Sequence, residues 1–192
     1  MPHLIIIADP NGAGKSTTAP ALLNDALSIE NFVNADVIAQ GLCAYQPEKA
    51  AIEAGRVMLK RIHQLASEQA DFAFETTLAT RSFAQWIPQL KTKGYQFHLI
   101  VLWLQDAELA VLRVNERIKM GGHSVPEETI RRRYKAGLKN FFNLYTPIAD
   151  VWRIYNNSDP HPSLIAAKTH HYPITIKQPG IWQHLTEVYH DQ

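Results

Sequence analysis

The chain has 192 residues, of which 46% are hydrophobic and 19% are charged, and its formal net charge is +1. These values exclude an intrinsically disordered chain, argue against a strongly basic nucleic-acid binder, and fit one domain over residues 1–192. The longest apolar run, Leu99 to Leu104, is far shorter than the roughly 20 residues of a membrane span, and no signal-peptide pattern opens the chain. We therefore expect a globular protein of the cytoplasm without a membrane segment.

Short apolar runs alternate with amphipathic segments along the chain. Strands are predicted at Leu4–Ala8, Phe32–Asp36, Phe72–Thr76, Gln96–Leu104 and Val151–Tyr155. Helices are predicted from the loop after the first strand through Leu23, from Pro47 onward with Leu59, Ile62 and Ala66 on one face, at Arg81–Lys93 before Gly94, at Ala107–Met120, and from Pro126 to about Leu144. After Pro160, Ile174–Ile176 could add an edge strand and Trp182–Tyr189 a last helix. This alternation predicts an α/β domain with a doubly wound, mostly parallel five-stranded sheet and helices on both faces.

The stretch IIIADPNGAGKSTT, Ile5 to Thr18, is nearly a complete phosphate-binding loop between a predicted strand and a predicted helix. Backbone N–H groups of Gly12 and Gly14 can close around phosphate oxygens, Lys15 can reach the outer phosphates, and Ser16 can ligate Mg²⁺. The expected nucleotide-binding residues are Asn11, Gly12, Ala13, Gly14, Lys15, Ser16 and Thr17. ATP and Mg²⁺ are therefore the expected cofactors.

The motif G-x-x-x-x-G-K-[ST] has its first glycine where this chain has Asp9. Aspartate tolerates positive φ better than most residues, so the loop can still form. A carboxylate about 5 Å from a phosphate would repel it by roughly 3 kcal/mol at an effective dielectric near 20, whereas an outward side chain would lose most of that effect. Asp9 thus motivates an alternative hypothesis, an ATP-binding module with little transferase activity.

Four further segments accompany the loop: NAD (Asn34 to Asp36), FETTL (Phe74 to Leu78), RVNERIKMGGHSV (Arg113 to Val125) and YNNS (Tyr155 to Ser158). Together with the loop they resemble the zeta toxin family of small P-loop kinases, from Leu4 to about Ser158. The resemblance implies transfer of the γ-phosphoryl group of ATP to a hydroxyl of a small acceptor. Nucleotide sugars such as UDP-N-acetylglucosamine become the first candidate acceptors, and an antitoxin protein becomes a candidate partner.

The resemblance assigns the acceptor side of the site to three residues. It implies that Asp36 is the general base for the acceptor hydroxyl, and that Glu75 and Thr77 hold the acceptor. The position of Asp36 near the carboxyl end of a strand is where ligands bind in doubly wound sheets. The alternatives are an Asx turn or helix cap for Asp36, strand-end capping for Glu75 and Thr77, and a place in the magnesium shell for Glu75.

The remaining candidates lie on a helical lid expected around residues 107–145 and on the loop after the fifth strand. Arg117 resembles the lid arginine of the family, and the second lid arginine is Arg131 or Arg133 rather than Arg132. With Lys15 and Asp36 these arginines make up the expected catalytic set. Asn157 is expected at the nucleotide base, with an ordinary turn as the alternative.

The sequence gives little support to a kinase that acts on the ends of nucleic acids. A nucleic-acid-end kinase would need a binding surface such as the basic segment Lys119 to Lys139, but the near-neutral charge and the lack of interleaved aromatic residues argue against it.

Cys43 is the only cysteine, so neither an intrachain disulfide nor a cysteine-based zinc site can form. The nine histidines show no metal-box spacing, and we expect no structural metal.

Overall fold

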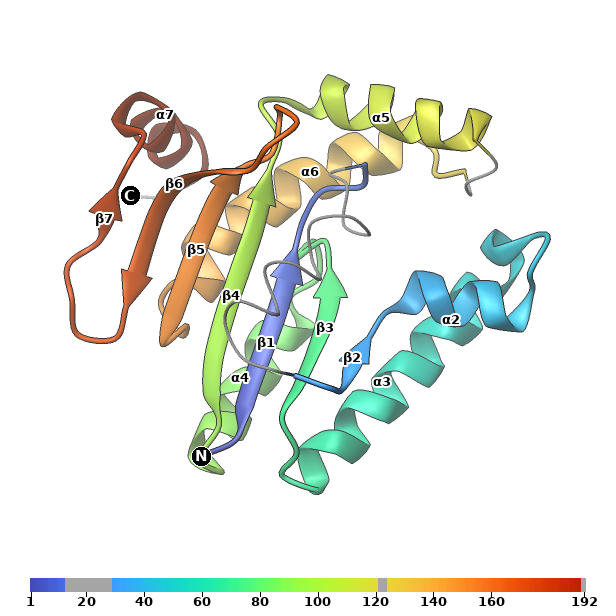
Figure 1. Ribbon diagram of the computed structural model, residues 1–192, viewed down its shortest axis with the longest axis horizontal. Coiled ribbons are helices and arrows are strands. Elements are labelled where there is room, and N and C mark those ends of the chain that lie inside the picture. Colours follow the sequence, from blue (N-terminus) through green and yellow to red (C-terminus); the bar gives the residue numbers. More distant parts are fainter. Residues whose placement is uncertain (13–28, 121–123, 191–192) are drawn as a thin grey trace.

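The computed structural model describes residues 1–12, 29–120 and 124–190, and strands and helices alternate over most of this length (Figure 1). The strands are β1 (His3–Ala8), β2 (Phe32–Val33), β3 (Phe72–Thr76), β4 (Gln96–Trp103), β5 (Val151–Asn156), β6 (Ser163–Thr169) and β7 (Thr175–Ile176). The helices are α2 (Ala35–Leu42), the 3₁₀ turn η1 (Pro47–Ala50), α3 (Ala51–Ser67), α4 (Ser82–Thr92), α5 (Ala107–Lys119), α6 (Glu127–Asn140), the π-helical turn η2 (Phe141–Tyr145) and α7 (Pro179–Tyr189). Of the helices in these ranges, none combines the length and the apolar character that crossing a bilayer requires.

One sheet runs through the molecule in the strand order β2-β3-β1-β4-β5-β6-β7. The first five strands of this order are parallel, as the alternating pattern predicts. The expected total of five strands is wrong, because the tail adds β6 and β7 as antiparallel strands and makes the sheet mixed. The segment Ser163–Thr169 was not predicted as a strand; it is half polar, and it pairs with β5 through a register shift at Ile154 and Tyr155.

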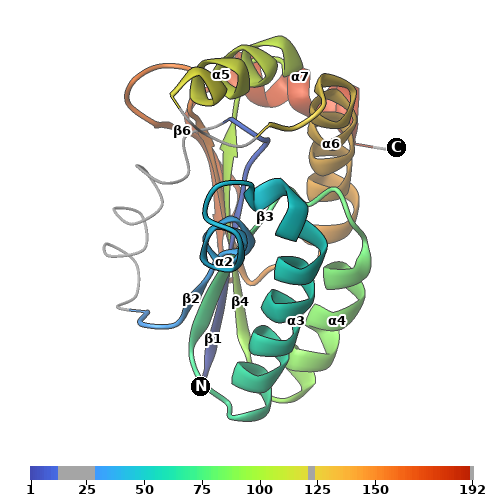
Figure 2. The ribbon, with the colours of Figure 1, turned by 90° about the vertical axis from the view of Figure 1, so that its right-hand side faces the viewer.

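The described helices that pack on the sheet cover one of its faces. Figure 2 shows α3, α4 and α6 side by side against this face, while α5 lies across the end where the parallel strands finish. Trp152 of β5 stacks on Trp182 of α7 at 5.4 Å, so α7 belongs to the same layer. The expected helix through Leu23 lies outside the described residues, so helical cover on both faces stays a prediction.

Most strands and helices lie where they are predicted, with two local corrections. Leu59, Ile62 and Ala66 were expected on the buried face of the long helix; Ile62 and Ala66 are buried, but Leu59 is 43% exposed, and Met58 and Leu65 complete that face. The second strand ends at Val33, three residues early, because Asn34 caps α2 by accepting hydrogen bonds from the backbone N–H groups of Asp36 and Val37 at 2.7 and 3.2 Å. Asp36 therefore lies in the first turn of a helix and not on a strand.

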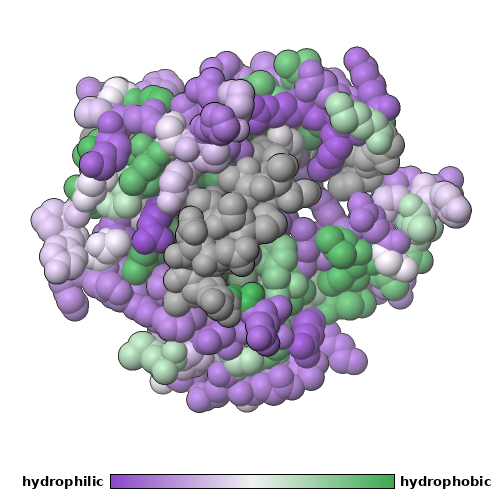
Figure 3. Space-filling view, viewed as in Figure 1, coloured by the Kyte–Doolittle hydropathy of each residue, from purple (hydrophilic) through white to green (hydrophobic). Residues whose placement is uncertain are grey.

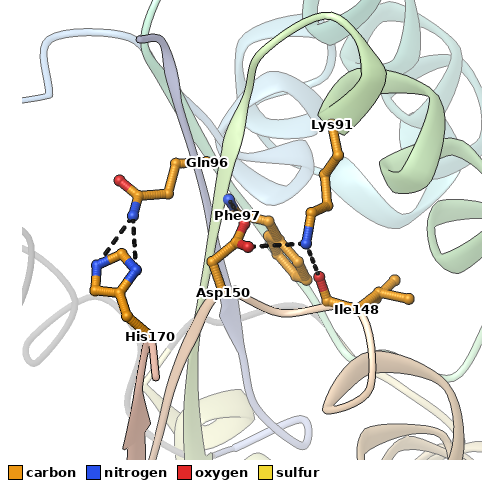
Figure 4. Close-up of polar contacts among 6 residues, drawn as sticks. All are labelled: Lys91, Gln96, Phe97, Ile148, Asp150 and His170. Atoms are coloured by element: carbon orange, nitrogen blue, oxygen red, sulfur yellow. Dashed lines mark hydrogen bonds and ion pairs between the residues drawn. The ribbon is translucent and has the colours of Figure 1, made fainter. Parts of the chain in front are cut away.

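Asp150, just before β5, joins four elements at the end of the sheet where the parallel strands begin (Figure 4). Its carboxylate accepts hydrogen bonds from the backbone N–H of Phe97 and from Lys91 Nζ, both at 2.8 Å, and Lys91 also donates to the Ile148 carbonyl. Its backbone carbonyl accepts from His170 N at 3.1 Å. Because these contacts lie at the end opposite the predicted site, they support the fold and not the chemistry.

Two histidines meet near the same end of the sheet. His3 Nδ1 of β1 and His98 Nε2 of β4 are 3.1 Å apart. Burial, together with repulsion from His3 and Arg153, lowers the pKa of His98 to about 4. His98 is therefore neutral in the folded protein at pH 7.

The His98 imidazole should make stability depend on pH. The unfolded chain takes up this proton near pH 6.5 and the folded chain only near pH 4, so stability is full above pH 6.5 and falls as the pH drops from 6.5 to 4. Allowing for the partial exposure of the ring, we expect a loss of about 1–2 kcal/mol over that window, which His98→Gln should remove. Denaturant unfolding at pH 7 and pH 4.5 measures the difference. The exposed His161→Gln serves as the control, and equal pH slopes for wild type and His98→Gln would exclude this account.

Candidate functional site

Three neighbouring strands end together beneath the lid helices and bring the predicted residues to one edge of the sheet. In the parallel register Ala8 of β1 lies between Thr76 of β3 and Val101 of β4. Beyond β1, the backbone N–H of Asp9 donates to the Thr76 carbonyl at 3.2 Å, which carries the pairing one residue further. The first residues of the phosphate loop therefore lie beside the end of β3, where Glu75 and Thr77 are located.

The beginning of the phosphate loop packs directly on α5. Gly12 has φ +89°, a region that L side chains rarely adopt, and a Cβ there would lie 2.7 Å from the Ala110 carbonyl oxygen and 3.3 Å from Arg113 Cβ. Asn11 beside it is buried. The other predicted loop residues, Ala13, Gly14, Lys15, Ser16 and Thr17, lie outside the described residues, so their roles stay predictions.

Asp9 is buried, with only 2% of its surface exposed. An outward carboxylate was one of two alternatives, and the burial excludes it. Asp9 lines a small pocket together with Thr77, Trp103, Arg133 and Gly137. This position places a carboxyl group between the start of the phosphate loop and the end of β3.

The acceptor side of the predicted site contains one contact that the sequence does not reveal. Asn34 Nδ2 donates to Glu75 Oε2 at 3.0 Å, and the Glu75 side chain is buried. Asn34 thus both starts α2 and orients the Glu75 carboxylate, a second role that its place before Asp36 in the NAD segment does not indicate. Asp36 is exposed on the first turn of α2, two residues from Asn34, and Thr77 is half-buried just beyond β3.

A groove of about 480 Å³ runs along the edge strand β2 beside these residues. Its lining includes Phe32, Asn34, Val37, Val57 and Arg61. Phe32, Val37 and Val57 are 38%, 62% and 42% exposed, so the lining of the groove is partly apolar and open to solvent. Figure 3 shows hydrophobic residues gathered on this side of the molecule over α2 and α3. The groove has the volume of a small-molecule site and opens next to the Asn34–Glu75 pair.

Arg117 on α5 has a partly buried guanidinium group. Its Nε and Nη2 atoms are buried, and no hydrogen-bond acceptor reaches them among the residues that the structure describes. Arg117 follows Arg113 by four residues, so it lies one turn further along the helix face that meets Gly12. Buried N–H groups of an arginine without an acceptor are costly, and an anionic ligand would satisfy them.

The two candidates for the second lid arginine have different environments. Arg131 Nε and Nη2 donate to both carboxylate oxygens of Glu108 at 2.7 and 2.8 Å, and Arg131 Nη1 is 3.0 Å from Glu127 Oε2. Arg131 therefore ties α6 to α5 and lowers the pKa of Glu108. Arg133 lines the pocket with Asp9, and its Nη1 is 3.5 Å from Asn11 Oδ1. This geometry favours Arg133 over Arg131 as the arginine that faces the phosphate loop.

Asn157 is buried in a loop that α5 holds in place. Arg113 donates from Nη1 to the Asn157 carbonyl at 2.8 Å and from Nη2 to the Ser158 carbonyl. The backbone N–H of Asn157 donates to the Trp103 carbonyl at 2.8 Å. Arg113 was not singled out from the sequence, where nothing distinguishes it from the other arginines on amphipathic helices. It connects the loop expected at the nucleotide base to the helix that touches Gly12.

These features agree with a comparison against known protein families, in which the model of the zeta toxin family matches residues 1–163. The chain belongs to the zeta toxin family. The match includes every predicted site residue and stops at the first residue of β6. An uncharacterised protein of Haemophilus influenzae is 31% identical over 130 residues, which cover 68% of this chain and 91% of that protein.

Solved structures share the fold at low sequence identity. A chain from the PezAT chromosomal toxin–antitoxin system of Streptococcus pneumoniae matches this protein with a TM-score of 0.68 and 17% sequence identity. The match covers all of this chain and 80% of the PezAT chain. The AvrRxo1-ORF1:-ORF2 complex crystallised with ATP gives a TM-score of 0.76 and 15% identity, and the match spans 97% of this chain but only 64% of the other. A putative kinase from Chloroflexus aurantiacus gives a TM-score of 0.54 and 18% identity, covering 69% of this chain and 76% of that one. The fold is therefore that of P-loop kinases.

The buried guanidinium of Arg117 should contribute to anion binding and not to folding. Charge-assisted hydrogen bonds contribute about 1.5–3 kcal/mol, so Arg117→Met should weaken binding of magnesium-ATP roughly 10- to 100-fold. Methionine keeps the aliphatic stem and removes an uncompensated buried charge, so the melting temperature should stay equal or rise. Calorimetric titration and thermal unfolding measure the two effects. Lys119→Met, an exposed change on the same helix, is the control, and a loss of stability without weaker binding would make Arg117 a folding residue.

Proposed function

We propose that this member of the zeta toxin family is an ATP- and Mg²⁺-dependent kinase that transfers the γ-phosphoryl group to a hydroxyl of a small acceptor. The observation that carries the proposal is the Arg117 guanidinium, which lies one turn from the contact of α5 with Gly12 and whose buried N–H groups have no acceptor among the residues that the structure describes. Such a group fits a phosphate chain held by the loop. ATP would supply the phosphoryl group, and the bound Mg²⁺ would neutralise part of the negative charge on its phosphates. Ser16 is the proposed metal ligand, and Lys15 is proposed to contact the outer phosphates.

The described residues divide into a donor side and an acceptor side. On the donor side, Arg117 and Arg133 neutralise charge on the transferred group, and Asn157 borders the nucleotide base. On the acceptor side, Asp36 accepts the proton of the attacking hydroxyl, while Glu75 and Thr77 hold the acceptor. The hydrogen bond from Asn34 to Glu75 supports this division, because Asn34, which orients the Glu75 carboxylate, lies two residues before the proposed base Asp36. Arg131 acts indirectly, by holding α5 and α6 together through Glu108.

UDP-amino sugars such as UDP-N-acetylglucosamine are the first candidate acceptors within this proposal. The groove along β2 supports a ligand of that size, with the exposed Phe32 ring available to a base and Arg61 to a diphosphate. An antitoxin protein is the proposed macromolecular partner, and the likeness to the PezAT chain supports it. The cytoplasm is the proposed compartment, since ATP is the phosphoryl donor.

A second candidate function is an ATP-binding module with little transferase activity. The observation that favours it is the burial of Asp9 at the start of the phosphate loop, where its charge opposes the phosphates. Magnesium-ATP incubation with a panel of nucleotide sugars and metabolites separates the two. A mass gain of one phosphate on an acceptor supports the kinase, whereas ATP binding without any phosphorylated acceptor supports the module.

Asp36→Asn tests the assignment of the base. Because general-base contributions are typically 10²- to 10⁴-fold, transfer should fall at least about 10²-fold while the dissociation constant for ATP changes little. Transfer rates on the acceptor found in the panel and calorimetric titration with ATP give the two values. Lys15→Ala is the contrasting variant and should weaken ATP binding and transfer together, since it acts on phosphate charge in both states. Equal transfer by wild type and Asp36→Asn would remove Asp36 from the mechanism.

Asp9→Gly tests the effect of the carboxylate on the phosphate loop. We expect the glycine variant to bind magnesium-ATP between about 3-fold and 100-fold more tightly, since up to roughly 3 kcal/mol of repulsion is removed. Because Asp9 is buried, the gain should persist in high salt. Titration with a non-hydrolysable ATP analogue at low and high salt measures both. Unchanged or weaker binding would show that the loop has adapted to aspartate and would also remove the main support for the module.

A further inference from the structure

The segment after β3, Thr77 to Thr80, contains a strained turn. Leu78 has φ +54°, the left-handed region that leucine rarely adopts, and its side chain is 1% exposed. The backbone N–H of Leu78 donates to Thr76 Oγ1 at 3.2 Å, which helps to bend the chain. Strained residues of this kind persist only where their surroundings hold them, and they concentrate at functional sites.

The surroundings that hold this turn belong to one continuous helical segment. Asn140, the last residue of α6, donates from Nδ2 to the Leu78 carbonyl at 2.7 Å and is itself buried. Tyr145 at the end of η2 donates from its hydroxyl to the Thr80 carbonyl at 3.1 Å. Gly137 allows the approach, because a Cβ there would lie 2.4 Å from the Thr77 carbonyl oxygen. The carbonyls of the turn thus meet α6 and η2 at three points.

The same helix also reaches the start of the phosphate loop. Arg133 lies one turn before Gly137, lines the pocket with Asp9 and Thr77, and approaches Asn11. One rigid helix therefore contacts both the segment beside the phosphates and the segment that carries Thr77.

We propose that Asn140 is a positioning residue for the acceptor side of the site. By donating to the Leu78 carbonyl it holds the left-handed turn, and the turn fixes Thr77 relative to the phosphate loop. The inference rests on the proposed function in one respect, namely that Thr77 contacts the acceptor. If Asn140 had a purely structural role, replacing it would lower the stability of the protein and leave the KM for the acceptor unchanged.

The test compares the same substitution at two asparagines of one helical segment. Asn140→Leu keeps the number and branching of the side-chain heavy atoms and removes the donor to Leu78. Asn143→Leu is the matched control, because Asn143 Nδ2 donates to the carbonyls of Lys139 and Tyr189, both at 2.9 Å and both outside the turn. Gly137→Ala is a further variant that pushes on the Thr77 carbonyl without removing a hydrogen bond.

Two measurements distinguish positioning from simple stabilisation. Amide hydrogen exchange of the peptide spanning residues 76–81 should become faster in Asn140→Leu and Gly137→Ala and stay at the wild-type rate in Asn143→Leu. With UDP-N-acetylglucosamine as the probe acceptor, the KM for the acceptor should rise roughly 3- to 10-fold in Asn140→Leu, whereas the KM for ATP should stay within about 2-fold.

The two measurements also separate this inference from the proposed function. If the wild type fails to phosphorylate the probe, the proposed acceptor is wrong, and the exchange of residues 76–81 still decides whether Asn140 holds the turn. Exchange that is unchanged in Asn140→Leu overturns the inference. So does a rise in the KM of the acceptor that Asn143→Leu reproduces, since general loosening of the helix would then be the cause.

Discussion

Backbone-to-backbone contact between the lid helices and the strand ends is the constraint on which the candidate site depends. Gly12 meets the Ala110 carbonyl of α5, and Gly137 of α6 meets the Thr77 carbonyl beyond β3. A Cβ atom at Gly12 would come too close to the Ala110 carbonyl oxygen, and a Cβ atom at Gly137 too close to the Thr77 carbonyl oxygen. Because both oxygens belong to the backbone, any larger residue at either position would force the two segments apart. The two glycines therefore set how closely α5 and α6 approach the carboxyl edge, and so the reach of Arg117 and Arg133.

The forces that keep α5 and α6 together are mainly apolar. Arg131 forms a bidentate pair with Glu108, but both side chains are well exposed, and such pairs typically contribute about 0.2–1 kcal/mol. The buried residues of α5 and α6 include Ala110, Val111, Val114, Ile130 and Tyr134, and all five belong to one hydrophobic cluster. Burying one large apolar side chain contributes about 1.5–3 kcal/mol, so the burial of these residues can exceed the ion pair several-fold. The ion pair of Arg131 then fixes how α5 and α6 are aligned, while apolar burial contributes most of the free energy that keeps them packed.

The sequence predicts the parallel part of the fold well because each strand carries a local signal. Phe72–Thr76 contains two phenylalanines and a β-branched threonine, and its predicted and observed limits coincide. The strand predicted at Phe32–Asp36 ends at Val33, because Asn34 caps α2. The strand at Ser163–Thr169 was missed since its pairing with β5 is a long-range contact that half-polar alternation does not reveal.

The candidate site could be predicted only in part from the sequence, because its contacts are also long-range. A motif identifies residue types, and so it singled out Glu75, Thr77 and Arg117, but it carries no information on what each side chain touches. Only the structure separates Arg131, occupied by Glu108 and Glu127, from Arg133, which faces the pocket at Asp9. The same holds for Asn140, which lies inside the helix predicted from Pro126 to about Leu144 and was not singled out. Its hydrogen bond to a left-handed leucine 62 residues away connects the end of α6 to the turn after β3. Positioning contacts of this kind join backbone carbonyls to side chains that are distant in sequence, and therefore leave no local pattern.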